Sequence, residues 1–130
     1  MEIWTASILE RKLIKMTILL RRKPEMSHDE FVTYHRKNHA PLFLSLEEVK
    51  QHVRRYVQCH ATGEQLPGLP DNHIDGSTEL WFDDLTGLAG VFQSPNYMAT
   101  IRPDEEKFLD LHACEFLVGV ENEVIPALHA

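Results

Sequence analysis

Four short stretches of the chain have the alternating pattern, or the β-branched and aromatic content, that is typical of strands. The first, residues 15–22 (KMTILLRR), has apolar side chains on both faces, which predicts a strand that is covered on both sides. The others are residues 52–60 (HVRRYVQCH), 78–82 (TELWF) and 113–120 (ACEFLVGV).

A helix is expected between the first two strands. Ser27, with Glu30 three residues later, has the capping-box pattern that begins a helix. Pro41 lacks an N–H group and crowds the preceding turn, so we expect this helix to break or kink near residues 38–40. A second helical segment then covers residues 42–51.

Two more helices are expected between the third and fourth strands. Asp83 or Asp84 can cap the first of them. Pro103 opens the second, because proline is favoured at the first helical position and acidic residues at the positive end of the helix dipole. Phe108 lies on the apolar side of this second helix. We expect its acidic side chains to be solvated; they are Asp104, Glu105, Glu106 and Asp110.

The predicted order is strand, helix, strand, strand, helix, strand, which is the ferredoxin-like βαββαβ arrangement. The fold class is therefore α+β, with a four-stranded antiparallel sheet. A chain of 130 residues suffices for one such domain. We place it at residues 15–124, between an N-terminal extension (1–14) and a C-terminal tail (125–130). A long loop over residues 61–76 separates the second and third strands.

The apolar content of the strands predicts a partner subunit. Two short helical layers cover one face of a sheet, and nothing in the chain remains to cover the other. An exposed apolar face favours association, so we expect a homodimer through the sheet face. The residues that we expect to be too many for the helices alone are Ile18, Leu20, Leu80, Phe82, Phe116 and Val118.

Charge and hydropathy exclude several classes of partner. A net charge of −7 argues against a nucleic-acid partner and gives no attraction to anionic membranes. No apolar run approaches the roughly 20 residues of a membrane span. Glu2 and the charged run at residues 10–12 are unlike a signal peptide, so we expect a cytoplasmic protein.

Two histidines on the first helix are candidates for chemistry. His35 and His39 are four residues apart and share a face. That spacing suits two metal ligands, but HRKNH lacks the glutamate of the HExxH motif and no third ligand is evident, so we predict no metal site. His39 lies at the expected helix break, where an imidazole can act as acid or base near neutrality. A turn or capping histidine fits the spacing equally well.

Strand alternation suggests one wall of a pocket. Tyr56 and His60 share a face of the second strand, and Glu79 and Trp81 share a face of the third. If these faces coincide, the four side chains line a small-molecule site. A carboxylate within a strand is costly unless it is paired or functional. The alternative, slightly favoured, is a salt bridge from Glu79 to Arg54 or Arg55 on the neighbouring strand.

Residues 16–42 (MTILLRRKPEMSHDEFVTYHRKNHAPL) resemble the opening of EthD-type proteins. The shared pattern is a strand that ends in Arg/Lys-Lys-Pro, then Ser-x-x-x-Phe, then His-Ala-Pro-Leu. Two later segments, GSTELWFD (76–83) and DEEKFLD (104–110), also resemble the family and occur in the right order. The resemblance covers residues 15–124.

The resemblance implies a dimeric α/β barrel built from the ferredoxin-like unit. Relatives include proteins of ether degradation, polyketide-tailoring enzymes and lactone isomerases. Several use a pocket between sheet and helices, with histidine and tyrosine as acid or base and no cofactor. His39 matches the histidine of the His-Ala-Pro-Leu turn, and Tyr56 falls where related lactone isomerases have a tyrosine.

We therefore expect a cofactor-independent enzyme acting on an aromatic, polyketide-like or lactone substrate by isomerisation, cyclisation, decarboxylation or dehydration. His39 acts as acid or base, Tyr56 polarises an oxygen and Glu79 orients the proton. The alternatives are a non-catalytic, dimeric small-molecule-binding protein of a degradation pathway and a cofactor-free monooxygenase. The residues expected to bind substrate are Tyr34, His35, His60, Trp81 and Phe108.

Overall fold

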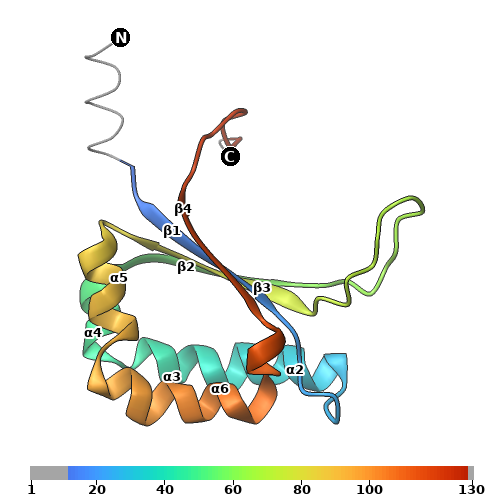
Figure 1. The fold of residues 1–130 in the computed structure, drawn as a ribbon, viewed down its shortest axis with the longest axis horizontal. Helices are drawn as coiled ribbons and strands as arrows, with labels where there is room; N and C mark the ends of the chain where they lie inside the picture. The colour runs from blue at the N-terminus through green and yellow to red at the C-terminus, as the bar shows by residue number, and fades with distance from the viewer. Residues whose placement is uncertain (1–11, 129–130) are drawn as a thin grey trace.

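The computed structural model describes residues 12–128, which form a four-stranded antiparallel sheet with helices on one face (Figure 1). The strands are β1 (Ile14–Leu20), β2 (Val53–His60), β3 (Gly76–Phe82) and β4 (Glu115–Val120). Their spatial order is β2-β3-β1-β4, so the predicted ferredoxin-like topology is confirmed. Of the predicted N-terminal extension, residues 1–11 lie outside the described part of the chain.

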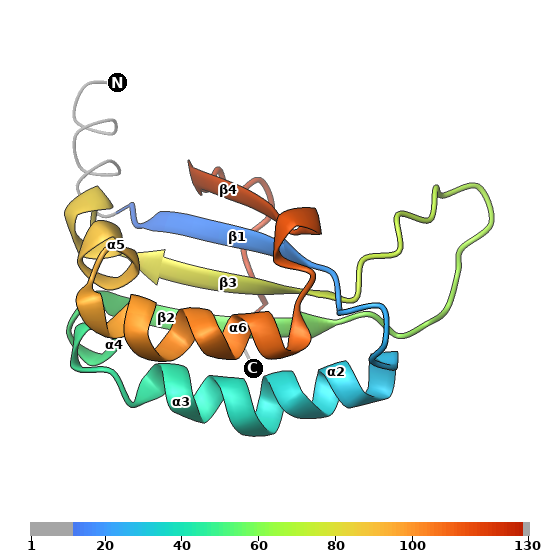
Figure 2. The same ribbon diagram turned by 60° about the horizontal axis from the view of Figure 1, so that its bottom comes forward.

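The helices form a layer below the sheet, in which α3 and α6 run side by side (Figure 2). Among residues 12–128, no helix is long and apolar enough to cross a membrane. The α-helices are α2 (His28–Tyr34), α3 (Ala40–Leu44), α4 (Glu47–His52), α5 (Leu85–Phe92) and α6 (Arg102–Phe108). The π-helices are η1 (His35–His39) and η2 (Tyr97–Ile101), and η3 (Leu111–Ala113) is a 3₁₀ turn.

The predicted capping box begins α2. Ser27 Oγ accepts a hydrogen bond from the Glu30 backbone N–H, and the Glu30 side chain accepts one from the Ser27 N–H. At α5, Asp84 Oδ1 accepts from the Gly87 N–H at 2.8 Å. Both caps satisfy backbone donors that have no partner within the helix.

Of the predicted break or kink near residues 38–40, the break is wrong, because the helix does not end there. The chain instead widens into the π-helix η1, in which the Ala40 N–H donates to the carbonyl oxygen of His35, and then continues as α3. Pro41 sits in the first turn of α3, where a missing N–H costs little. A π-bulge of this kind is frequent at functional sites, and here it contains both His35 and His39.

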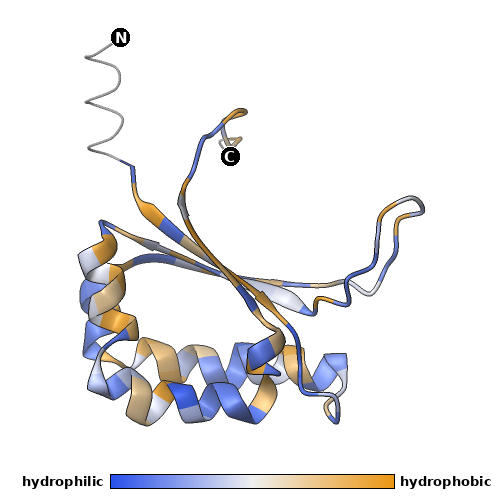
Figure 3. Cartoon of the chain, in the orientation of Figure 1, coloured by the Kyte–Doolittle hydropathy of each residue, from blue (hydrophilic) through white to orange (hydrophobic). Residues whose placement is uncertain are grey.

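The helices cover more of the apolar sheet than we predicted. Ile18, Leu20, Leu80 and Phe82 are all buried under the helical layer. Of the six apolar residues that we expected to be too many for the helices, Phe116 and Val118 stay exposed, at 55% and 44%, because β4 is an edge strand. Leu117 and Val120 are exposed too, and β4 is mostly apolar along its length (Figure 3). The surface left for a partner is therefore centred on β4.

The loop between β2 and β3 projects away from the body of the molecule (Figure 1). Its base is held by Asp75, whose carboxylate accepts from the Arg22 N–H at 3.0 Å and contacts His28 Nδ1 at 2.8 Å. The opposite side of the His28 ring, Nε2, lies 2.8 Å from the carbonyl oxygen of Ala61. The loop is thus fastened to the start of α2 at both of its ends.

Candidate active site

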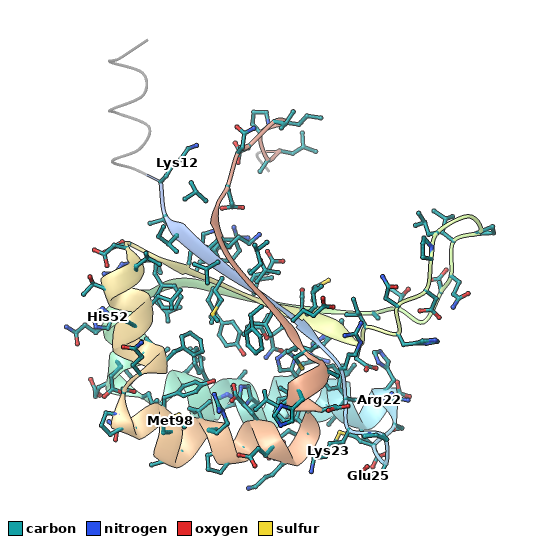
Figure 4. All side chains as sticks on the ribbon, in the orientation of Figure 1. Lys12, Arg22, Lys23, Glu25, His52 and Met98 are labelled. Atoms are coloured by element: carbon teal, nitrogen blue, oxygen red, sulfur yellow. The ribbon has the colours of Figure 1, made fainter. Side chains whose placement is uncertain are left out.

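Side chains from the sheet and the helices meet in the space between the two layers (Figure 4), and a cavity lined by residues of both layers remains among them. The cavity wall is largely apolar, formed by aromatic residues such as Phe43, Phe92, Phe108 and Phe116 together with aliphatic side chains. Its main polar groups are His35, His39, Tyr56, Thr78 and Glu105. An apolar site with a few convergent polar groups is typical of a ligand pocket.

His39 is oriented by a buried carboxylate. Its Nδ1 lies 2.8 Å from Asp104 Oδ2, and both residues are buried. Because an ionised carboxylate only accepts hydrogen bonds, Nδ1 is the donor in this contact, and in the neutral ring the lone pair is on Nε2. Within residues 12–128, no group forms a hydrogen bond with Nε2. This nitrogen is therefore available to take a proton from a molecule in the cavity.

Tyr34 fixes the orientation of Asp104 by a second hydrogen bond to its carboxylate. Its hydroxyl donates to Asp104 Oδ1, so both carboxylate oxygens are engaged. Burial, reinforced by the neighbouring carboxylate, raises the pKa of Tyr34 to about 12. Tyr34 consequently remains a donor at neutral pH and holds the orientation of Asp104.

Tyr56 presents a hydroxyl to the same cavity. Its oxygen accepts from Gln58 Nε2 at 2.8 Å, which leaves the phenolic proton free to be donated elsewhere. Burial raises the pKa of Tyr56 to about 12, so the group is a neutral donor. Gln58 also donates to the carbonyl oxygen of His35 at 2.9 Å, which links β2 to η1.

His35 is a neutral, fully buried histidine. It is 1% exposed, and its pKa is lowered to about 3 by burial and by the proximity of His39 and His60. Its Nδ1 lies 3.0 Å from His60 Nε2, and its Nε2 lies 3.2 Å from Thr78 Oγ1. Both ring nitrogens are thus hydrogen-bonded.

The prediction that Asp104 and Glu105 are solvated is wrong. They are 5% and 8% exposed, since the first turn of α6 faces the cavity rather than solvent. Glu105 accepts from the Tyr97 hydroxyl and from Arg102 Nε at 3.0 Å. The sequence held a signal for Asp104: it lies four residues before Phe108 and so must share that residue's apolar face.

The prediction that Glu79 and Trp81 share a wall with Tyr56 and His60 is also wrong. Across the β2–β3 pair, Tyr56 stands opposite Leu80, whose side chain points to the helices. Since neighbouring residues of a strand face opposite sides, Glu79 and Trp81 lie on the open face of the sheet.

On the open face, Glu79 forms a salt bridge, as the alternative interpretation held, but with Lys15 rather than an arginine. Lys15 Nζ lies 2.5 Å from Glu79 Oε2. Lys15 and Arg55 also lie over the Trp81 ring, at 4.9 Å and 4.6 Å from its centre. Trp81 Nε1 donates to Glu121 at 2.6 Å. These groups satisfy one another and belong to no cavity shared with His39.

The other predicted site residues divide into two groups. His35, His39, Tyr56 and Phe108 line the cavity. Tyr34 and His60 stand behind it and reach it through Asp104 and His35. Within residues 12–128, no three histidine, cysteine or acidic side chains are arranged to hold a metal ion.

Comparison with curated proteins gives relatives of low identity. The chain is 28% identical over 118 residues to Dehydratase ustZ of Ustilaginoidea virens, and this alignment covers 83% of each protein. It is 26% identical over 124 residues to the conidial pigment biosynthesis dehydratase EthD of Metarhizium robertsii, and this alignment covers 88% of this chain and 87% of the relative.

Solved structures share the fold. An EthD family protein of Bacillus halodurans superimposes with a TM-score of 0.63 at 19% identity, and the superposition covers 85% of this chain and 99% of the Bacillus chain. A protein of Thermobifida fusca, described as dimeric and ferredoxin-like, superimposes with a TM-score of 0.60 at 14% identity, covering 85% and 92%.

The family assignment comes from the sequence model of the EthD domain. That model matches residues 23–112, a segment that includes the helical layer, β2, β3 and most of the cavity wall. Because the match extends over well more than half of the chain, this protein belongs to the EthD family.

Proposed function

We propose that this protein is a cofactor-independent dehydratase for a cyclic β-hydroxy carbonyl compound. The observation that carries the proposal is the His39–Asp104 pair, which leaves Nε2 of His39 free in an aromatic cavity that also contains the Tyr56 hydroxyl. The dehydratase names of the relatives support this reaction class.

In the proposed reaction, Tyr56 keeps its proton and donates a hydrogen bond to the substrate carbonyl oxygen. His39 Nε2 removes a proton from the carbon next to the carbonyl, and Asp104 stabilises the resulting imidazolium. The enolate then expels the β-hydroxyl group, which leaves as water after it gains a proton. The phenylalanine side chains of the wall would hold a flat ring system and exclude bulk water.

We also propose that the protein forms a homodimer that covers β4. Four apolar side chains on this edge strand are exposed, and structural neighbours are described as dimeric. An exposed apolar edge strand is prone to pair with another chain. Light scattering that returns only monomer mass at micromolar concentration would contradict this part of the proposal.

A β-hydroxytetralone is a suitable probe substrate, because loss of water converts it into a fluorescent naphthol. The wild-type protein should accelerate this conversion, and His39→Asn should lower kcat about a hundredfold or more. Glu79→Gln, on the other face of the sheet, should turn over the probe at the wild-type rate. Equal rates for wild type and His39→Asn would refute the assignment of His39.

The same probe separates catalysis from simple binding. A non-catalytic binding protein would show a rise in Tm with the β-hydroxytetralone, because a ligand that binds only the folded state stabilises it, but no naphthol would form. That outcome, in a protein whose fold is intact by circular dichroism, would exclude the dehydratase for this substrate class and favour the binding protein.

A further inference from the structure

Two histidines and a threonine next to the cavity have no part in the acid–base roles of His39, Asp104 and Tyr56. Thr78 Oγ1, both nitrogens of His35 and His60 Nε2 form a continuous hydrogen-bonded line, with contacts of 3.2 Å and 3.0 Å. Thr78 and His35 line the cavity, whereas His60 is half-buried at the end of β2. The line therefore connects the cavity with the surface.

The chemistry of the three groups determines how this line responds to a proton. When His60 is protonated, both of its ring nitrogens carry hydrogen, so its Nε2 donates and His35 Nδ1 must accept. A neutral His35 then has its only hydrogen on Nε2 and donates it to Thr78 Oγ1. The Thr78 hydroxyl hydrogen, released from His35, points into the cavity.

When His60 is neutral, its Nε2 can accept, and every bond in the line reverses. His35 then donates from Nδ1, and its Nε2 accepts the hydroxyl hydrogen of Thr78. The two states differ by the net transfer of one proton along the line. Each member both donates and accepts, which is what a chain of proton transfers requires.

We propose that Thr78, His35 and His60 form a proton relay that carries a proton from the protein surface to the leaving hydroxyl group of the substrate. This inference rests on the proposed dehydratase function. It assigns Thr78 as the acid that contacts the substrate, while His35 and His60 act through Thr78.

The proton balance of one turnover then closes. His39 takes the proton from carbon, and the carbon–oxygen bond breaks with its electron pair on oxygen. Thr78 gives its hydroxyl hydrogen to that oxygen to form water. His35 Nε2 then gives its hydrogen to the Thr78 oxygen, and His60 Nε2 gives a hydrogen to His35 Nδ1. His60 regains its proton from solvent. His39 returns its proton to water in the emptied cavity, so no net proton is consumed.

The charged neighbours of His60 favour proton release at its end of the line. Burial lowers the pKa of His60, and the positive charges of Arg36 on η1 and His28 on α2 lower it further. His28 is itself paired with Asp75 at the base of the loop. His39 is the other titratable ring beside His35, at 6.0 Å between ring centres.

Nitrogen-15 NMR of the histidine rings tests the relay without any substrate. As pH falls through the titration of His60, the His35 hydrogen should move from Nδ1 to Nε2 with the same midpoint. In His60→Gln this switch should vanish, because glutamine does not titrate. A single His35 tautomer across the His60 titration of the wild-type protein would overturn the proposal, whether or not the protein is a dehydratase.

Kinetics with the β-hydroxytetralone probe add a second, independent readout. Thr78→Val should lower kcat about a hundredfold, and Thr78→Ser, which restores the hydroxyl, should recover most of it. His60→Ala should lose about tenfold and regain activity with added imidazole buffer. A tautomer switch without turnover by the wild-type protein would refute the proposed reaction alone. Turnover that is unaffected in Thr78→Val would refute the relay alone.

Discussion

The two faces of the sheet use similar side chains for different purposes. On the helix-covered face, His39, Asp104 and Tyr56 are buried around a cavity, and one nitrogen of His39 is left free for a ligand. On the open face, Glu79 and Trp81 are fully occupied by Lys15, Arg55 and Glu121. A carboxylate and an aromatic ring are present on both faces, so residue type alone does not distinguish a site from a surface network.

The difference lies in burial and in spare hydrogen-bonding capacity. A salt bridge that is partly exposed to water contributes little to stability and reacts with nothing. A buried imidazole held by a carboxylate keeps a basic nitrogen directed at the cavity. Substitutions on the helix-covered face should therefore have larger effects than substitutions on the open face.

The largest effect is expected from Asp104→Asn on the covered face. An asparagine can donate to His39 Nδ1 and so favour the wrong tautomer, with the proton on Nε2. We expect kcat for the β-hydroxytetralone to fall about a hundredfold, as is usual when acid–base catalysis is lost. Tyr34→Phe, which keeps the carboxylate, should lose less. Wild-type activity in Asp104→Asn would show that His39 does not need its partner.

The second effect is a loss of stability in acid that comes from His35. The pKa of His35 is lowered from 6.5 to about 3 in the native protein. Below pH 6.5, His35 therefore binds a proton in the unfolded chain but not in the native protein. Unfolding is then favoured as pH falls, at about 1.4 kcal/mol per pH unit, or about 2 kcal/mol between about pH 6 and about pH 4.5.

Urea unfolding at a series of pH values measures this slope. His35→Gln removes the titrating ring and should flatten the pH dependence, whereas His112→Gln, at an exposed histidine, should leave it unchanged. Identical slopes for His35→Gln and the wild-type protein would mean that other groups cause the acid sensitivity.

The third effect is expected from Tyr56→Phe, which keeps the ring in the cavity and removes only the donor. We expect kcat/KM to fall about tenfold, because one hydrogen bond to the developing oxyanion is worth about 1 to 2 kcal/mol. The matched variant Tyr97→Phe alters a hydroxyl that is bonded to Glu105 instead and should affect kcat/KM less. If kcat/KM falls equally in both variants, the Tyr56 hydroxyl has no specific role in the reaction.

The smallest effect is expected on the open face. Glu79→Gln removes the partner of Lys15, and both side chains keep about a quarter of their surface exposed. The free energy of unfolding should change by less than about 1 kcal/mol, and turnover should not change. A tenfold loss of kcat in Glu79→Gln would place the open face in the catalytic machinery and abolish the contrast drawn here.

Much of the fold could be predicted from local patterns. The capping box at Ser27, the aspartate cap of α5 and the strand at residues 78–82 all depend on residues close in sequence. The response to Pro41 was not predictable in this way, because a proline can be accommodated by a break or by a π-bulge. Packing of η1 against α6 and the sheet favours the continuous helix.

The site was predictable only in part. His39 and Tyr56 could be proposed from motif and position, and both reach the cavity. Asp104 was missed, because a run of acids at a helix start is usually solvated, and its burial depends on Tyr34 and His39, which are 70 and 65 residues away. Glu79 was placed on the wrong side, since alternation tells which residues of one strand share a face but not which face meets the helices.

The amino-acid sequence by itself determined the order of elements, the caps and the alternation along each strand, because these depend on hydrogen bonds and side-chain directions within a few residues. Only the tertiary structure decided which face of the sheet became the cavity and which carboxylate reached His39. Those outcomes depend on the register between strands and on how helices distant in the chain pack over them, which no local pattern encodes.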